Sequence, residues 1–359
     1  MYTSEKILTV LERIVHPSSG KDIVSMGMIK DLTILGKKIS FSLTFSAFND
    51  PLKTSLKNAC EQILKDEFNN IEELDIKIIT PVAPVVNKTE ETLPKVKNII
   101  AIASGKGGVG KSTVAANLAV AFAKSGAKTG LIDADIYGPS IPKMFDIENK
   151  KPSIKPVNGK DKIVPVEKYG VKILSIGFFV DPEDATIWRG PMASNALKQL
   201  VNDGHWEELD YLFIDLPPGT SDIHITVSQD LNLSGAIIVS TPQDIALADV
   251  TKGINMFRND KINVPILGLI ENMAWFAPEE LPGNKYYIFG KSGCKELSKK
   301  MDVPFIGEIP IIQSVREDAD KGSPSVLKKN KTSEYFKHIA EAIRVNLLKQ
   351  KSGYKYNNN

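Results

Sequence analysis

Hydrophobic residues in the first 80 positions follow helical and strand spacings in turn. Apolar side chains recur every three or four residues in two segments, and they form apolar runs, one of them alternating, in three others. The predicted elements are a helix at 6–15, strands at 28–35 and 39–45, a helix at 52–63 and a strand at 74–79. Because only Gly36-Lys37-Lys38 separates the first two strands, they are expected to form a β-hairpin. This order predicts a small α-β-β-α-β domain, of the α+β class, at residues 1–80.

The pattern changes after residue 80. Residues 81–96 are rich in proline and polar side chains without periodicity, which is typical of a linker. Beyond it, apolar strands alternate with helical segments; these strands are expected at 99–103, 129–132, 172–176, 211–214, 236–240 and 266–270. Such alternation favours the α/β class, with a mainly parallel sheet covered by helices on both faces, at 97–350. The polar tail at 351–359 is expected to be disordered.

Composition narrows the possible partners and compartments. The 359 residues carry a net charge of +2, too close to neutral for an electrostatic footprint on nucleic acid. No apolar stretch approaches the length of a membrane span, so we expect a cytoplasmic protein without a membrane partner. Cys60 and Cys294 are the only cysteines. Two cysteines exclude a disulfide framework and a four-cysteine metal site within one chain.

A glycine-rich segment follows the first strand of the larger region. Gly105 to Ser112 fits G-x-x-x-x-G-K-S between the expected strand at 99–103 and an expected helix at 114–124. Backbone N–H groups of such a loop converge on phosphate oxygens. The predicted ATP-binding residues are Gly105, Lys106, Gly107, Gly108, Val109, Gly110, Lys111, Ser112 and Thr113. Lys111 is expected to contact the β- and γ-phosphates, and Ser112 the Mg²⁺ ion.

Three aspartates and one asparagine lie just after strands of the same predicted sheet. Asp133 and Asp135 follow the strand at 129–132, Asp215 follows 211–214, and Asn272 follows 266–270. The carboxyl ends of parallel strands face the ligand crevice, and Mg²⁺ prefers oxygen ligands. The aspartates are therefore candidates for Mg²⁺ binding and for orienting a water molecule. Asn272 is either an adenine-binding amide or a structural side chain.

The second lysine of the loop, in Lys106-Gly-Gly-Val-Gly-Lys-Ser-Thr, resembles the deviant Walker A class of P-loop ATPases. The resemblance implies a nucleotide-sandwich homodimer in which Lys106 acts across the interface. It also implies that Asp135 positions the attacking water and that Asp215 is associated with Mg²⁺. Gly219 is then expected to offer its N–H to the γ-phosphate, and Asn272 to contact the base.

Longer strings are more specific than the loop. They include the segments 133–142, 188–192, 215–220, 240–244 and 271–273, and they look like the Mrp/ApbC family of iron–sulfur cluster carrier ATPases. The first 80 residues are similar to the small iron–sulfur assembly domain that is often fused to it. The resemblance implies an ATP-hydrolysing carrier or scaffold that passes iron–sulfur clusters to apoproteins, with assembly factors as further partners.

One departure from this family affects the cargo. Members commonly carry a Cys-x-x-Cys pair, shared across the dimer to hold a [4Fe–4S] cluster, where this chain has Ala277 and Glu280. Cys294, at the start of an expected helix, is then either a cluster ligand with a lowered pKa or a small packed side chain. Cys60 is expected on the apolar face of its helix, packed in the hydrophobic core. The alternative functions are a nucleotide-switched adaptor and a spatial-organiser ATPase, each without a cluster.

Overall fold

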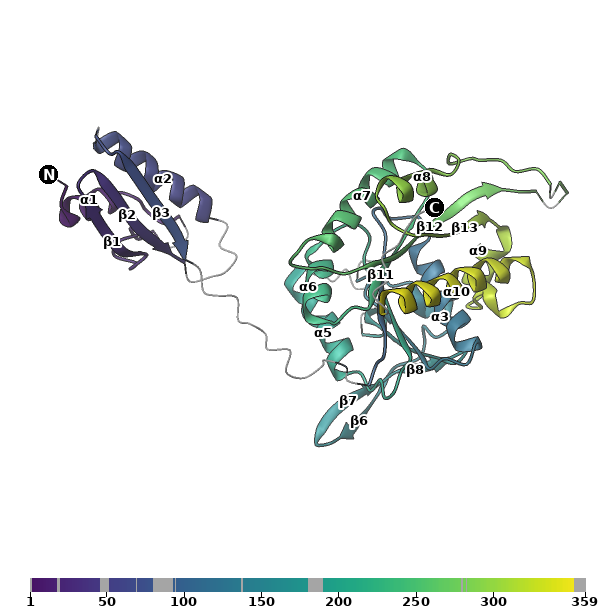
Figure 1. Cartoon of the computed structure of the whole chain (residues 1–359). Helices are drawn as coiled ribbons and strands as arrows, with labels where there is room; N and C mark the ends of the chain where they lie inside the picture. Colours follow the sequence, from purple (N-terminus) through teal and green to yellow (C-terminus); the bar gives the residue numbers. More distant parts are fainter. Residues whose placement is uncertain are drawn as a thin grey trace. The chain divides into compact units, whose positions relative to one another are not determined.

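The computed structural model describes residues 2–17, 20–45, 52–68, 70–79, 93, 95–136, 138–179, 190–278, 280–281 and 283–351. Most of the predicted linker at 81–96, residues 352–359 of the predicted tail, Tyr137, Trp188 and Arg189 lie outside these residues. The chain divides into two compact units, Met1–Thr89 and Glu90–Asn359 (Figure 1). Each unit has its own hydrophobic core and is described by itself.

The smaller unit has the element order expected from its hydrophobic pattern. Its elements are α1 (Ser4–Leu11), β1 (Ile29–Leu35), β2 (Lys38–Thr44), α2 (Lys53–Glu67) and β3 (Glu73–Ile79). β2 is the central strand of the sheet, antiparallel to β1 and parallel to β3. One face of the sheet packs on the helices through buried side chains such as Phe41, Leu43 and Leu64. Cys60 is fully buried in this core, and burial raises its pKa to about 12.

The larger unit is built on an eight-stranded sheet in the order β13-β12-β11-β4-β10-β5-β9-β8. The strands are β4 (Ile99–Ala103), β5 (Thr129–Asp133), β8 (Val166–Lys168), β9 (Val171–Ser175), β10 (Tyr211–Asp215), β11 (Gly235–Ser240), β12 (Ile266–Phe276) and β13 (Phe305–Ile311). All neighbours pair in parallel except β8 and β9, which confirms the mainly parallel sheet. A separate hairpin joins β6 (Ser153–Val157) and β7 (Lys160–Val164).

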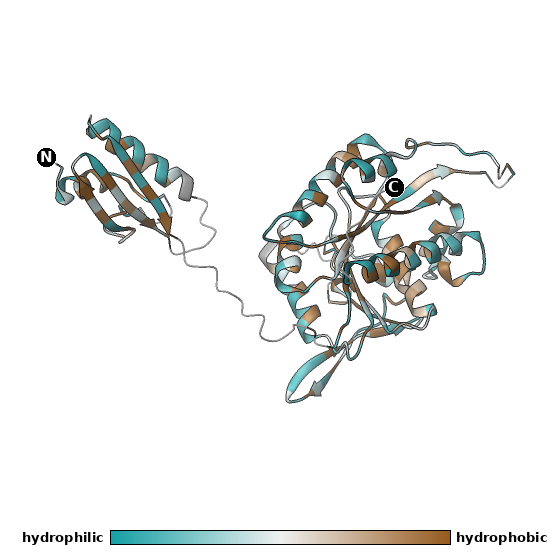
Figure 2. Ribbon diagram, in the orientation of Figure 1, coloured by the Kyte–Doolittle hydropathy of each residue, from teal (hydrophilic) through white to brown (hydrophobic). Residues whose placement is uncertain are grey.

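Helices cover both faces of this sheet (Figures 1 and 2). They are α3 (Lys111–Lys124), α4 (Ile141–Met144), α5 (Gly190–Asp203), α6 (Asp222–Asp230), α7 (Asp244–Arg258), α8 (Gly293–Lys300), α9 (Gln313–Asp320) and α10 (Lys331–Lys351), with short 3₁₀ turns at Ile176–Phe178 and Ser325–Leu327. Alternate residues of β4 enter two separate cores. Ile99 and Ala101 pack with residues of α5 to α8, whereas Ile100 and Ile102 pack with α3 and α10. A central strand buried on both faces explains its unbroken apolar sequence.

Among the described residues, no helix combines the length and the hydropathy that crossing a membrane requires.

Candidate nucleotide-binding site

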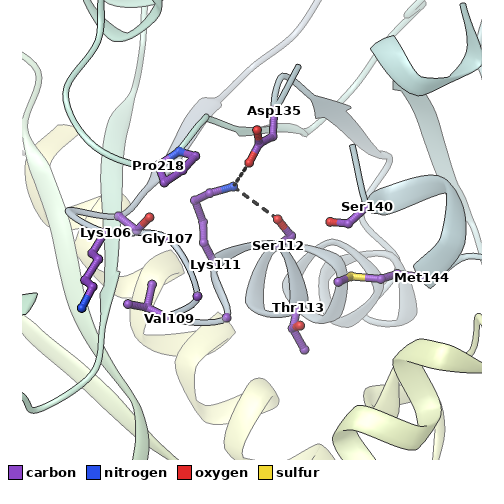
Figure 3. Close-up of a pocket in the computed structure, with 13 residues that line it drawn as sticks. Lys106, Gly107, Val109, Lys111, Ser112, Thr113, Asp135, Ser140, Met144 and Pro218 are labelled. Carbon is purple, nitrogen blue, oxygen red and sulfur yellow. Dashed lines mark hydrogen bonds and ion pairs between the residues drawn. The ribbon is translucent and has the colours of Figure 1, made fainter. Parts of the chain in front are cut away.

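The glycine-rich loop joins β4 to α3 at the carboxyl edge of the sheet and encloses a pocket of about 210 Å³ (Figure 3). The pocket is lined by Ser104, Lys106–Thr113, Asp135, Ser140, Met144 and Pro218. Gly108 and Gly110 have φ angles of +80° and +83°, which side chains rarely tolerate. At Gly105 the constraint is contact, because a Cβ atom would lie 2.6 Å from the backbone of Asp249 and Val250 in α7. Local sterics therefore require glycine at these positions.

Lys111, the first residue of α3, lies among acidic and hydroxyl groups. Its buried Nζ is 2.6 Å from Asp215 Oδ1, 4.0 Å from Asp135 Oδ2 and 3.3 Å from Ser112 Oγ. Figure 3 shows its side chain turned into the pocket toward Asp135 and Ser112. The parallel pairing of β10 with β5 brings Asp215 beside Asp133, two residues before Asp135. The topology thus places these carboxylates next to the lysine of the loop.

Buried polar atoms without a hydrogen-bond partner are concentrated near this pocket. Three of the five found among the described residues belong to Ser104, Asp215 and His224. The other two belong to His16 and Arg344. Such atoms are rare in native structures, because leaving them unpaired costs about 1–3 kcal/mol each. The unpaired Oδ2 of Asp215, together with the Ser112 hydroxyl, provides the oxygen donors that Mg²⁺ prefers, so the residues fit this ion.

Asp133 and Asp135 have different environments. Asp133 is fully buried and accepts hydrogen bonds from Ser175 Oγ (2.9 Å), Ile141 N (3.2 Å) and Asp135 N (3.2 Å). Burial, and then the charge of Asp215, raise the pKa of Asp133 to about 7. Asp135, in contrast, lines the pocket. Asp133 thus fixes the backbone after β5, and Asp135 is the carboxylate available to a ligand.

Three other expected ligand-binding groups have protein partners or face solvent in this structure. Gly219, with φ of +85°, donates its N–H to the carbonyl of Ser104 at 2.8 Å. Asn272 is buried, and its Nδ2 donates to the carbonyl of Val109 at 2.8 Å. Lys106 is exposed, and its side chain points away from Lys111 (Figure 3). Their contacts with γ-phosphate, adenine and a second subunit stay predictions.

Cys294 does not have the lowered pKa expected at a helix start. It lies at the beginning of α8 but is fully buried, with its N–H donating to Glu271 Oε2 at 2.7 Å and its Sγ 3.8 Å from the carbonyl of Thr241. Burial, and then the nearby Glu271 carboxyl, raise the pKa of the thiol. These two effects outweigh that of the helix N-terminus, so of the two alternatives the structure favours the small packed side chain over a thiol of lowered pKa.

Among the described residues, Ala277 and Glu280 belong to no metal-binding group. Over the described part of the chain, no group of three or more His, Cys, Asp or Glu side chains is arranged to hold a metal ion. Ala277 is partly exposed and Glu280 is exposed, beyond the end of β12. The strand itself passes through Met273 with a φ of +56°, close to a register shift against β13.

Sequence reasoning missed two buried titratable residues of this edge. His224 lies in the first turn of α6, and Glu271, beside Asn272, is the last residue of β12 that pairs with β11. His224 follows Ser221 by three residues, and the two form a reciprocal capping box at the helix start. That spacing was the available signal, although a capping box usually carries Glu or Gln at the third position. Nothing in the local sequence marks Glu271 as buried.

Known proteins resemble each unit of this chain. Residues 95–344 match the family described as NUBPL iron-transfer P-loop NTPase, and residues 4–72 match the iron–sulfur cluster assembly protein family. An iron–sulfur cluster carrier protein of Synechocystis is 40% identical over 328 residues, which are 91% of this chain and 92% of that protein. A mitochondrial iron–sulfur protein of Arabidopsis thaliana, required for NADH dehydrogenase, is 52% identical over 67% of this chain and 74% of its own.

One similar solved structure contains a bound nucleotide. A nucleotide-binding protein of Archaeoglobus fulgidus in complex with ADP is 40% identical, with a TM-score of 0.58, over 68% of this chain and 94% of that one. The family match covers the P-loop, Asp135, Asp215 and Asn272, and the relatives extend over most of the chain. This chain therefore belongs to the NUBPL iron-transfer P-loop NTPase family.

Proposed function

We propose that this protein is an ATP-hydrolysing iron–sulfur cluster carrier whose nucleotide state controls the binding and release of cargo. The observation that carries the proposal is the P-loop lysine, Lys111, held between Asp215 and Asp135 in a chain closely related to iron–sulfur cluster carrier proteins. The nucleotide chemistry follows from this geometry. The cargo follows from the family.

ATP binding exchanges the partners of Lys111. The ammonium group leaves Asp215 for the β- and γ-phosphates and stabilises the charge that develops there during hydrolysis. Ser112 and Asp215 would hold Mg²⁺, which neutralises phosphate charge when it is bound. Asp135 lines the pocket and orients the attacking water. The backbone N–H groups of Gly107 to Gly110 contact the phosphates, and the N-terminus of α3 favours their negative charge.

The switch loop after β10 responds to the γ-phosphate. In this structure the Gly219 N–H donates to Ser104, at the start of the P-loop. A γ-phosphate oxygen competes for that donor, so binding ATP and releasing phosphate would move the segment between Asp215 and Ser221. Asn272 undergoes a similar exchange between the Val109 carbonyl and adenine. Both exchanges give ATP and ADP different contacts with the protein, as a switch requires.

We further propose a homodimer in which Lys106 contacts the nucleotide of the partner subunit. The support is its exposed side chain, which points away from Lys111 of its own loop (Figure 3). Mixing Lys106→Ala subunits with Lys111→Ala subunits tests this arrangement. Each mixed dimer contains one site with its own Lys111 and the partner's intact Lys106, so we expect turnover to recover at half of the sites. Absence of recovery in dimers shown to be mixed would contradict action across the interface.

The cargo site cannot use the common four thiolates, because Ala277 and Glu280 replace the cysteine pair. Cys294 is not among the ligands that we propose, since its thiol is buried and its pKa is raised. A bound cluster would then be held at the dimer interface by weaker protein ligands or by small thiols. Assembly factors would donate the cluster, and apoproteins would receive it. The same substitutions favour a second candidate function, a nucleotide-switched adaptor that no longer binds a cluster.

Anaerobic reconstitution with iron and sulfide separates the two functions. A carrier is expected to gain iron and acid-labile sulfide and to pass them to an apo form of a [4Fe–4S] protein, with a yield that differs between ATP and ADP. An Ala277→Cys/Glu280→Cys variant, which restores four thiolates per dimer, is the positive control for the assay. Cluster in this variant but none in the wild type, with ATP hydrolysis intact in both, would favour the adaptor.

A further inference from the structure

His224 is a buried histidine with a defined tautomer beside the switch loop. Its side chain is fully buried, and its Nδ1 accepts a hydrogen bond from the Ser221 N–H at 3.2 Å. The Ser221 hydroxyl also lies 3.2 Å from Nδ1. A nitrogen that accepts from a backbone N–H carries no proton, so a neutral ring has its proton on Nε2. Burial, and to a smaller extent the charge of Lys111, lower the pKa of His224 to about 4, which keeps the ring neutral.

The Nε2–H group is a donor that lacks a well-formed hydrogen bond. It is buried without a partner of good geometry, although the backbone carbonyl of Pro217 is close enough to interact favourably with the ring. An unpaired buried donor is unfavourable, so a shorter contact between Nε2–H and the Pro217 carbonyl would stabilise the fold. The N-cap of α6 explains Nδ1, but it does not explain Nε2.

Pro217 lies at the centre of the loop that the nucleotide is expected to move. Asp215, two residues before it, pairs with Lys111, and Gly219, two residues after it, donates to Ser104. Pro218 lines the nucleotide pocket. A displacement of the Pro217 carbonyl therefore moves the segment between the carboxylate that pairs with Lys111 and the N–H group that donates to Ser104.

We propose that His224 is a positioning residue for ATP hydrolysis, which uses its Nε2–H to hold the Pro217 carbonyl and so fixes the switch loop in its catalytic conformation. The proposal rests on the ATP hydrolysis in the proposed function and is independent of the cargo. The ring touches neither phosphate nor water. It acts through the backbone of the loop, while its other nitrogen anchors the same loop to α6.

The two ring nitrogens can be tested separately with amide side chains. In His224→Asn the side-chain oxygen replaces Nδ1 and keeps the helix cap, but no donor reaches the position of Nε2. In His224→Gln the amide nitrogen lies near the position of Nε2 and keeps the donor, whereas the cap is weakened. Ser221→Ala removes the other side chain of the cap and serves as the matched control.

We expect His224→Asn to lower kcat about tenfold, the effect of one lost hydrogen bond, with the KM for ATP changed less than about threefold. His224→Gln and Ser221→Ala are expected to retain kcat within about threefold, even where the urea midpoint falls. A role limited to capping predicts the reverse order, with Asn close to wild type and Gln impaired, and that order would overturn the proposal.

Three further outcomes are decisive. Equal loss of kcat in the Asn and Gln variants, in proportion to their loss of stability, would also reject a positioning role. If His224→Asn does not fold, the Gln variant decides, because a tenfold loss of kcat in a stable His224→Gln protein contradicts the proposal. Lack of ATP turnover in the wild type would instead reject the proposed function itself, so the two failures are distinguishable.

Discussion

The P-loop edge and the segment from Glu271 to Cys294 differ in how their polar groups are satisfied. At the P-loop, Lys111 is shared between carboxylates, and buried atoms of Ser104 and Asp215 have no hydrogen-bond partner. In the second segment, Glu271 caps α8 through the Cys294 N–H, and the Lys285 ammonium lies 3.9 Å from the centre of the Trp275 ring. The first region contains buried polar atoms without a protein partner, whereas none of these atoms belongs to the described residues of the second.

The outer surface of the second segment strengthens this contrast. Phe276 and Tyr286 form an antiparallel bridge, and beyond it large apolar side chains are exposed, including Leu281 at 53% and Ile288 at 61%. At the two positions where the family resemblance implies cysteines, this segment has Ala277 and Glu280, and neither side chain is a thiolate. The difference teaches that the described residues place a phosphate-binding loop beside its carboxylates, whereas the only thiol described in the second segment, that of Cys294, is buried.

The largest expected effect comes from Lys111→Ala. Loss of the ammonium group should lower ATP turnover by roughly 100-fold to 1000-fold, because phosphate charge in the transition state loses its stabilisation. Lys128→Ala, which removes a lysine whose side chain is 63% exposed and paired with Glu208, is the control and should match the wild type. Phosphate release by Lys111→Ala at the wild-type rate would end the assignment of this edge as the nucleotide site.

Asp135→Asn should have a smaller and more selective effect. We expect kcat to fall roughly 10-fold to 100-fold while ATP affinity changes less than about threefold, since the carboxylate orients water and does not hold the ground state. Steady-state phosphate release and equilibrium binding of a fluorescent ATP analogue give the two quantities. An equal loss of binding and rate would indicate a ground-state role at Mg²⁺ instead.

The two regions should respond to pH with opposite signs. The pKa of His224 is lowered to about 4 from 6.5, so its contribution to stability is present above pH 6.5 and is lost as the pH falls. At pH 5 the loss is about 2 kcal/mol, from about 1.4 kcal/mol per pH unit. The pKa of Glu271 is raised by burial, so its contribution is present below its unfolded pKa and is lost as the pH rises.

Urea unfolding at pH 7.5 and pH 5 can separate these contributions. The free energy of unfolding should fall less between the two pH values in His224→Gln than in the wild type. In Glu271→Gln, which keeps an acceptor for the Cys294 N–H, it should fall more. Parallel pH profiles for the wild type and both variants would contradict the difference between the two regions.

The smallest effect concerns thiol reactivity. Both cysteines are buried and burial raises both pKa values, so the native protein should react with a thiol reagent at neither position. Unfolding should expose two thiols per chain. Ala277→Cys, at a partly exposed position, is the matched variant and should add one reactive thiol to the native protein. Rapid native labelling of Cys294 would reopen it as a cluster ligand.

Sequence reasoning predicted the elements that local pattern determines. Strands buried on both faces, such as β4, show as apolar runs, and the P-loop is defined by residues within one turn. The edge strand β13 was not predicted, because Gly307, Glu308 and Pro310 interrupt its apolar pattern. The exposed strands β6 and β7 contain no apolar run at all.

The remaining features of the site depend on packing between distant segments. Cys294 is buried because α8 packs against the ends of β11 and β12, more than 20 residues away in sequence, and its pKa follows from that environment. The same is true of His224, whose pKa reflects burial and a lysine more than 100 residues earlier. Sequence spacing carries no information about such burial, so the sequence alone left both alternatives for Cys294 open.

The contact at Gly105 also limits how the loop can move. With 2.6 Å between a hypothetical Cβ and the backbone of Asp249, no clearance exists between the loop and α7 on that side. A displacement toward the helix is blocked, so the loop either moves away from α7 or carries the helix with it. In the second case the motion reaches Ile245, which is 71% exposed in the first turn of α7. The close contact at Gly105 thereby couples any motion of the loop toward α7 to motion of the helix.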